Sequence, residues 1–135
     1  ASEADLIDAF TSQFTPRTKV LTLTHVSNLS GVKLPVKQII QAARANGIYV
    51  HLDGAQTWGA MKLDLKDLDP DSYSASAHKW YMGPKEVGLL YVKSQNIDKI
   101  WPSVIAPGWG DAASTILQGA RKFESLGQRD DAVLA

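Results

Sequence analysis

Residues 19–53, KVLTLTHVSNLSGVKLPVKQIIQAARANGIYVHLD, contain the pattern that decides the fold. The first six residues are rich in β-branched and apolar side chains, which predicts a strand. An apolar stripe at helical spacing follows, formed by Val36, Ile39, Ile40 and Ala43. Asn46-Gly47 is a typical helix stop, and residues 48–52 again have strand composition. Strand, helix and strand in this order predict a parallel βαβ unit.

Further elements are expected on both sides of this unit. In chain order they are an amphipathic helix over residues 4–14 that Pro16 ends, a strand over residues 72–76, a strong strand over residues 87–92 and a short helix over residues 95–101. Pro and Gly are frequent in residues 102–120, which predicts mostly loop, and a helix is expected to begin near Asp130. Together these patterns predict an α/β fold with a mostly parallel sheet.

Composition excludes several classes of function. The chain has 135 residues, enough for one domain, and 14 basic against 14 acidic side chains. No basic stripe points to a nucleic acid, and no apolar run is long enough for a membrane span. The absence of Cys removes disulfides and thiolate chemistry and fits a cytoplasmic protein. The three His are not spaced as a metal cluster.

Polar side chains follow three of the predicted strands, at the point where each strand ends. Asn28 follows the first strand, Asp53 and Gln56 follow the second, and Ser76, His78 and Lys79 follow the third. Parallel sheets bind ligands beyond these carboxyl ends. Each residue alone also has an ordinary structural interpretation, as a turn residue, a cap, a packed imidazole or a solvated charge. Their coincidence at one sheet edge predicts a ligand site.

The residue types suggest one kind of chemistry. Lys79 stands in Ser76-Ala77-His78-Lys79-Trp80-Tyr81, and a lysine amine in a largely apolar pocket becomes a nucleophile toward aldehydes. Asp53 could pair with a protonated ring nitrogen and keep an electron-sink ring charged. Ser76 and His78 offer donors to a phosphate group. A further alternative is an unrelated α/β hydrolase or binding domain, but the absence of Gly-x-Ser-x-Gly and P-loop motifs argues against its commonest forms.

Three segments resemble those of class V aminotransferase-like enzymes that use pyridoxal 5'-phosphate (PLP). Asp53-Gly54-Ala55-Gln56 resembles their Asp-Gly-Ala-Gln segment, Ser76-Ala77-His78-Lys79 their Ser-x-His-Lys segment, and Thr24-His25-Val26-Ser27-Asn28 their His-Val-(Ser/Asn)-Asn segment. The family includes cysteine desulfurases, lyases and isopenicillin N epimerase-like proteins. His78-Lys79-Trp80 and residues 123–131 look most similar to the epimerase-like branch.

The resemblance implies a role for each residue. Lys79 matches the Schiff-base lysine and the catalytic residue, Asp53 the partner of the pyridinium nitrogen, and Gln56 the donor to the cofactor's ring oxygen. Ser76 and His78 match phosphate ligands, and Asn28 a residue near the ring oxygen and the substrate carboxylate. The implied fold is the three-layer α/β/α sandwich of the fold-type I large domain, with the strand at 87–92 antiparallel.

The resemblance also implies that residues 1–135 form part of a PLP-binding large domain, without the family's C-terminal small domain. The expected partners are an amino-acid substrate and, in the full-length enzyme, a second copy of the chain. Epimerisation, desulfuration or lyase chemistry, and transamination all remain open. The alternative is an isolated α/β module with no catalytic activity of its own.

Overall fold

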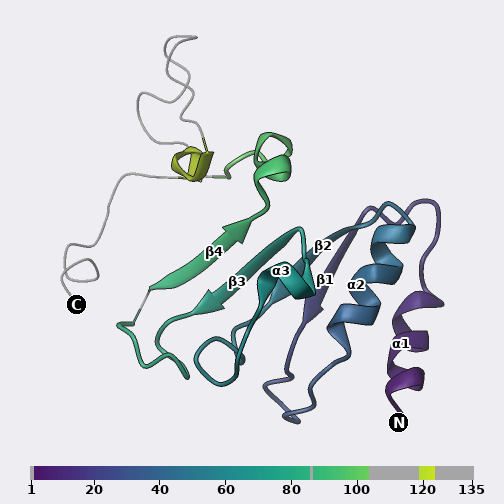
Figure 1. Cartoon of the computed structure of the whole chain (residues 1–135), viewed down its shortest axis with the longest axis horizontal. Helices are drawn as coiled ribbons and strands as arrows, with labels where there is room; N and C mark the ends of the chain where they lie inside the picture. The colour runs from purple at the N-terminus through teal and green to yellow at the C-terminus, as the bar shows by residue number, and fades with distance from the viewer. Residues whose placement is uncertain (1, 86, 104–118, 124–135) are drawn as a thin grey trace. The chain divides into compact units, whose positions relative to one another are not determined.

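The computed structural model describes residues 2–85, 87–103 and 119–123 of a chain that divides into two units, residues 1–91 and 92–135. The first unit contains, in order, α1 (Glu3–Thr11), β1 (Val20–Thr24), α2 (Val36–Ala45), β2 (Tyr49–Asp53), α3 (Leu65–Leu68), β3 (Ser72–Ser76) and β4 (Gly88–Val92), whose last residue belongs to the second unit (Figure 1). The second unit contains the short 3₁₀ helices η1 (Ser94–Lys99) and η2 (Gly119–Phe123).

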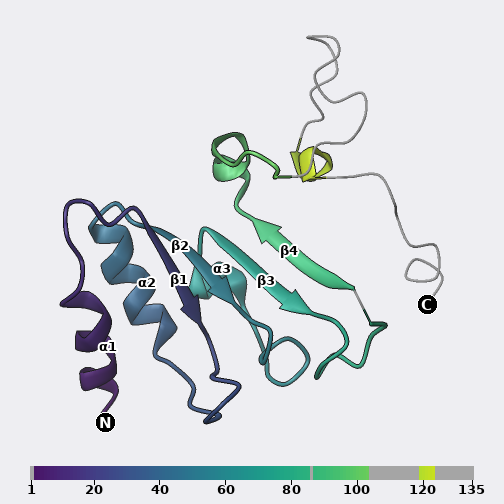
Figure 2. The ribbon, with the colours of Figure 1, turned by 180° about the vertical axis from the view of Figure 1, so that it is seen from behind.

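The strands form a four-stranded sheet in the order β1-β2-β3-β4. β1, β2 and β3 are parallel, and their register places Thr24 beside Asp53 and Asp53 beside Ser74. β4 runs in the opposite direction to β3 in both views (Figures 1 and 2), and the backbone N–H of Ala77 donates to the Val87 carbonyl at 2.9 Å. The predicted mostly parallel sheet is therefore confirmed, and so is the antiparallel last strand.

The helices of the first unit pack on one face of the sheet. Alternate strand residues form the floor of the core, namely Leu23, Val50, Leu52, Tyr73 and Ala75. The predicted stripe of α2 covers this floor, because Val36, Ile39, Ile40 and Ala43 are all buried. Side chains of α1 and α3 pack against the same cluster, and α2 contacts both of these helices. The described residues thus build the sheet and one helical layer.

The opposite face of the sheet is polar at its centre. Thr22, His51 and Ser72 lie side by side across β1, β2 and β3. His51 hydrogen-bonds through Nδ1 with the Ser72 hydroxyl at 2.8 Å and through Nε2 with the Ser74 hydroxyl at 3.0 Å. Period-two alternation therefore sends apolar side chains to the helices and hydroxyl and imidazole groups to the other face.

Several element boundaries differ from the sequence prediction. α1 begins at a Ser2–Asp5 capping box and ends at Thr11, three residues before the predicted end, and Phe14 packs on the core from beyond the helix. β2 is shifted by one residue, and the predicted helix at 95–101 is the 3₁₀ helix η1. Residues 104–118 of the predicted loop and the expected helix near Asp130 lie outside the described residues.

The short helix α3 was not predicted. Asp64 caps it, since Asp64 Oδ1 accepts hydrogen bonds from the backbone N–H groups of Lys66 and Asp67 at 2.9 and 3.0 Å. Four residues are too few for an apolar period to stand out. Within the described ranges, no helix has the length and apolarity needed to cross a membrane.

Candidate functional site

Asp53 is the last residue of β2 and is half-buried. Its carbonyl accepts a hydrogen bond from the backbone N–H of His25 at 2.9 Å, which ties the ends of β1 and β2 together. Its side-chain Oδ1 accepts from the backbone N–H of Ala55 at 2.9 Å. Asp53 is thus a turn residue, as its position before a glycine indicates, and this bond uses one of its two carboxylate oxygens.

Gly54 brings the next residues close to β3. A Cβ on Gly54 would lie 2.1 Å from the ring of Tyr73, a fully buried side chain, so a larger residue does not fit. The backbone N–H of Gly54 donates to the Ser74 carbonyl at 2.8 Å. The loop after β2 therefore lies directly against the strand that leads to Lys79.

Lys79 lies in a tight turn after β3. The backbone N–H of Met82 donates to the Lys79 carbonyl at 2.9 Å, and that of Gly83 donates to the Ala77 carbonyl at 2.7 Å. Lys79 is half-buried, whereas its neighbour His78 is exposed. Ser76, also half-buried, is the last residue of β3.

Aromatic stacking joins this turn to the loop after β2. The rings of Trp58 and Tyr81 stack with centroids 4.1 Å apart and planes 14° from parallel. Beside them Gly59 has φ +85°, and a Cβ there would lie 2.5 Å from the Tyr81 backbone. Only a glycine permits both the backbone angle and this close approach. The lysine turn is therefore held by the loop that carries Gln56.

A hollow of about 340 Å³ lies where the loops after β1, β2 and β3 meet. Asn28 contributes from the first loop, Gln56 from the second and Trp80 from the third. Trp80 Nε1 donates a hydrogen bond to Gln56 Oε1 at 3.0 Å. The predicted meeting of the three strand ends is thus present. Of the described residues, Asp53, Ser76, His78 and Lys79 are not among those that line this hollow.

The supporting residues Trp58, Gly59, Trp80 and Tyr81 were not predicted as part of the site. Two of them, Trp80 and Tyr81, directly follow Lys79 in the sequence as an aromatic pair, which was the available signal. No sequence pattern indicated Trp58 or Gly59, because their partners lie more than 20 residues away along the chain.

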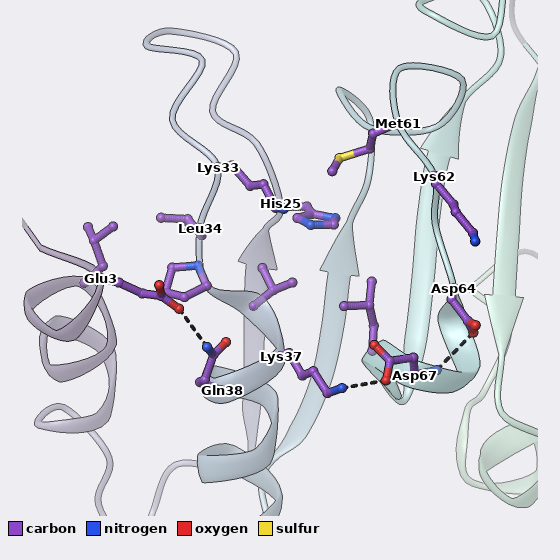
Figure 3. A pocket seen from close by; sticks show the side chains of 14 residues that line it. Glu3, His25, Lys33, Leu34, Lys37, Gln38, Met61, Lys62, Asp64 and Asp67 are labelled. Atoms are coloured by element: carbon purple, nitrogen blue, oxygen red, sulfur yellow. Dashed lines mark hydrogen bonds and ion pairs between the residues drawn. The ribbon is translucent and has the colours of Figure 1, made fainter.

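A larger hollow, of about 670 Å³, lies on the helical side of the sheet (Figure 3). His25 lines it and is 2% exposed, and its Nδ1 has no hydrogen-bond partner. Burial, and then the nearby charge of Lys33, lowers the pKa of His25 below its ordinary value of 6.5. Lys37 and Asp67 form an ion pair of 2.5 Å at its edge. None of the predicted site residues line this hollow, so we place the candidate site in the smaller one.

The chain is similar to known proteins along most of its length. Residues 2–124 match the family described as Aminotransferase class-V. The isopenicillin N epimerase of Streptomyces clavuligerus is 31% identical over 94% of this chain and 34% of its own length. The cysteine desulfurase CsdA of Escherichia coli superposes with a TM-score of 0.83 at 29% identity, over 95% of this chain and 33% of its own.

A third similar protein was solved with a bound amino acid. This C-DES mutant, with glycine covalently linked to its PLP cofactor, has a TM-score of 0.77 at 26% identity, over 90% of this chain and 34% of its own. The chain spans about a third of the length of each of these proteins. Residues 124–131, part of the epimerase-like segment, lie outside the described residues.

The mostly parallel sheet with helices packed on it is the α/β fold of the large domain of fold-type I PLP-dependent transferases. Both the sequence match and the fold lead to the same assignment: this chain belongs to the class V aminotransferase family of PLP-dependent enzymes.

Proposed function

We propose that this chain is the PLP-binding core of an enzyme that acts on an amino acid, with Lys79 as the residue that holds the cofactor. The observation that carries the proposal is the meeting of three loops at one sheet edge. Asn28, Gln56 and the turn that bears Lys79 come together there, joined by the hydrogen bond of Gln56 with Trp80. In open α/β sheets ligands bind at such an edge.

The groups present fit PLP chemically. Asp53 offers a carboxylate for a protonated ring nitrogen, with one oxygen already fixed by the Ala55 N–H. Gln56 offers amide hydrogens for a ring oxygen, since its Oε1 is engaged by Trp80. Ser76 and His78 offer hydroxyl and imidazole donors for a phosphate. When bound, the cofactor supplies an electron sink for the electron pair that a broken bond leaves at the substrate Cα.

In this proposal the chain's own residues bind, orient and move protons. Lys79 would hold the cofactor through Nζ, because a neutral amine is nucleophilic toward an aldehyde. The same Nζ amine, when free, would accept or return a proton at the substrate Cα. Asp53 holds the proton on the ring nitrogen, because a nearby carboxylate favours the charged form.

The reaction that follows proton transfer stays open among epimerisation, desulfuration or lyase chemistry, and transamination. The similarity to an epimerase and to a desulfurase fits the first two, and the family description Aminotransferase class-V fits the third. The alternative, an α/β module without catalytic activity, predicts no specific PLP binding. A homodimer and a cytoplasmic location also stay predictions, and light scattering of the chain with and without PLP tests the first.

The first test is PLP trapping. The chain is mixed with PLP, scanned for a visible absorbance band and reduced with borohydride, and the labelled peptide is identified by mass. We expect one label, on Lys79, and expect Lys79→Ala to lose both the band and the label.

Lys85→Ala is the matched control, because Lys85 is an exposed lysine of the same loop region and should keep the parent spectrum. Labels scattered over surface lysines, or a Lys79→Ala spectrum equal to that of the parent, would contradict the assignment.

A further inference from the structure

We propose that Trp80 is a positioning residue that determines which end of the Gln56 amide faces the cofactor. This inference rests on the proposed function, in which Gln56 donates to the ring oxygen of PLP. The observation behind it is the hydrogen bond of 3.0 Å from Trp80 Nε1 to Gln56 Oε1, with both residues lining the same hollow as Asn28.

The chemistry of the pair allows a single orientation. An indole N–H can only donate, whereas a side-chain amide has an accepting oxygen at one end and a donating NH₂ at the other. Gln56 must therefore turn Oε1 toward Trp80, and its NH₂ group becomes available to an acceptor. Without the indole donor the amide is free to rotate and to present Oε1 to the ionised ring oxygen, which it would repel.

The position of Trp80 follows from the turn rather than from burial. Its side chain is 59% exposed, so packing alone does not hold the indole over Gln56. The Trp58–Tyr81 stack of 4.1 Å and the Met82 N–H bond to the Lys79 carbonyl of 2.9 Å fix the turn on both sides of it. The turn that presents Lys79 thus also presents Trp80. The predicted cofactor contacts of Lys79 and of Gln56 therefore depend on the same turn.

The first arm of the test uses the chain without PLP. Trp80→Phe keeps an aromatic ring and removes the N–H donor. The indole N–H resonance of Trp80 is identified in the NMR spectrum by its loss in Trp80→Phe. We expect this resonance to move in Gln56→Ala, because its acceptor is gone. An unmoved resonance would overturn the inference.

The second arm measures the bound cofactor. We expect Trp80→Phe to weaken PLP binding about 2- to 10-fold, the worth of one hydrogen bond. A hydrogen bond donated to the ring oxygen reduces the negative charge on that oxygen. This charge stabilises the protonated form of the nitrogen that joins Lys79 to the cofactor. Loss of the hydrogen bond should therefore raise the pH midpoint of the visible band by about 0.5–1 unit. Trp101→Phe is the control, the same change at a tryptophan that is not among the residues lining this hollow, and should leave both values at the parent level.

A double-mutant comparison shows whether Trp80 acts through Gln56. In a Gln56→Ala background, Trp80→Phe should change neither the dissociation constant nor the midpoint any further. Equal effects of Trp80→Phe in both backgrounds would overturn the inference while the proposed function stands. If the parent chain does not bind PLP at all, the proposed function fails, and this inference fails with it.

Discussion

Gly59 shows how a single backbone position supports the candidate site. Its φ of +85° lies in the left-handed region, and a Cβ there would lie 2.5 Å from the backbone of Tyr81. Backbone cannot move aside as the end of a flexible side chain can. A substitution should therefore push away the turn that carries Lys79 as well as strain the loop after β2.

We expect Gly59→Ala to lower the free energy of unfolding more than Gly47→Ala does. Gly47 has a similar φ, +67°, but open space around it, so its change should cost only the left-handed strain, about 1–2 kcal/mol. Gly59→Ala should cost about 1–3 kcal/mol beyond that because of the overlap. Urea unfolding of the two variants measures the difference. Equal losses of unfolding free energy would show that the backbone of Tyr81 moves aside at no cost.

The predicted site residues differ in how far sequence could place them. Asn28, Asp53, Gln56 and Lys79 were predicted because each follows a predicted strand, and the parallel register brings those strand ends to one edge. Of these four, Asn28 and Gln56 line the hollow there. Sequence could not show that Trp80 donates to Gln56 across 24 positions, because that contact depends on the conformation of the Lys79 turn. The assigned roles themselves stay predictions.

At the level of elements, apolar periodicity predicted the structure where it covered whole turns. The stripe of α2 is buried at all four predicted positions, and its stop at Asn46-Gly47 is confirmed, with Gly47 at φ +67°. α1 ends at Thr11, and Phe14 packs on the core from outside the helix. Apolar spacing alone therefore could not show where the helix ends and the turn begins. α3 depends on the Asp64 cap rather than on any period.

Because the buried apolar stripe holds α2 on the sheet, the free energy of unfolding should depend on the side chains of this stripe. Ile40 is 1% exposed in the core, and we expect Ile40→Ala to cost about 2–5 kcal/mol of unfolding free energy through lost contacts and a cavity. Gln41→Ala, one residue later on an exposed position, should change it by less than about 0.5 kcal/mol. Chemical denaturation followed by circular dichroism compares them. Similar losses for the two variants would mean that α2 does not pack as described.

At the level of the whole molecule, buried ionisable groups limit stability from two sides. The pKa of His25 is lowered by burial, and next by Lys33. Below about pH 6.5 His25 therefore binds a proton in the unfolded chain but not yet in the folded chain. The free energy of unfolding falls with falling pH until the folded imidazole also binds its proton. Burial raises the pKa of Tyr49 and Tyr73 above 10.0, so above that pH the unfolded chain loses protons first and stability falls again.

The expected stability profile is thus a plateau between about pH 6.5 and pH 10, with a decline on each side. Each group contributes a slope of at most about 1.4 kcal/mol per pH unit. His25→Gln should flatten the acid side and leave the alkaline side unchanged, while Tyr49→Phe should reduce the alkaline slope alone. Urea midpoints measured across this range test both variants. An acid slope that persists in His25→Gln would mean that the buried imidazole does not set the acid limit.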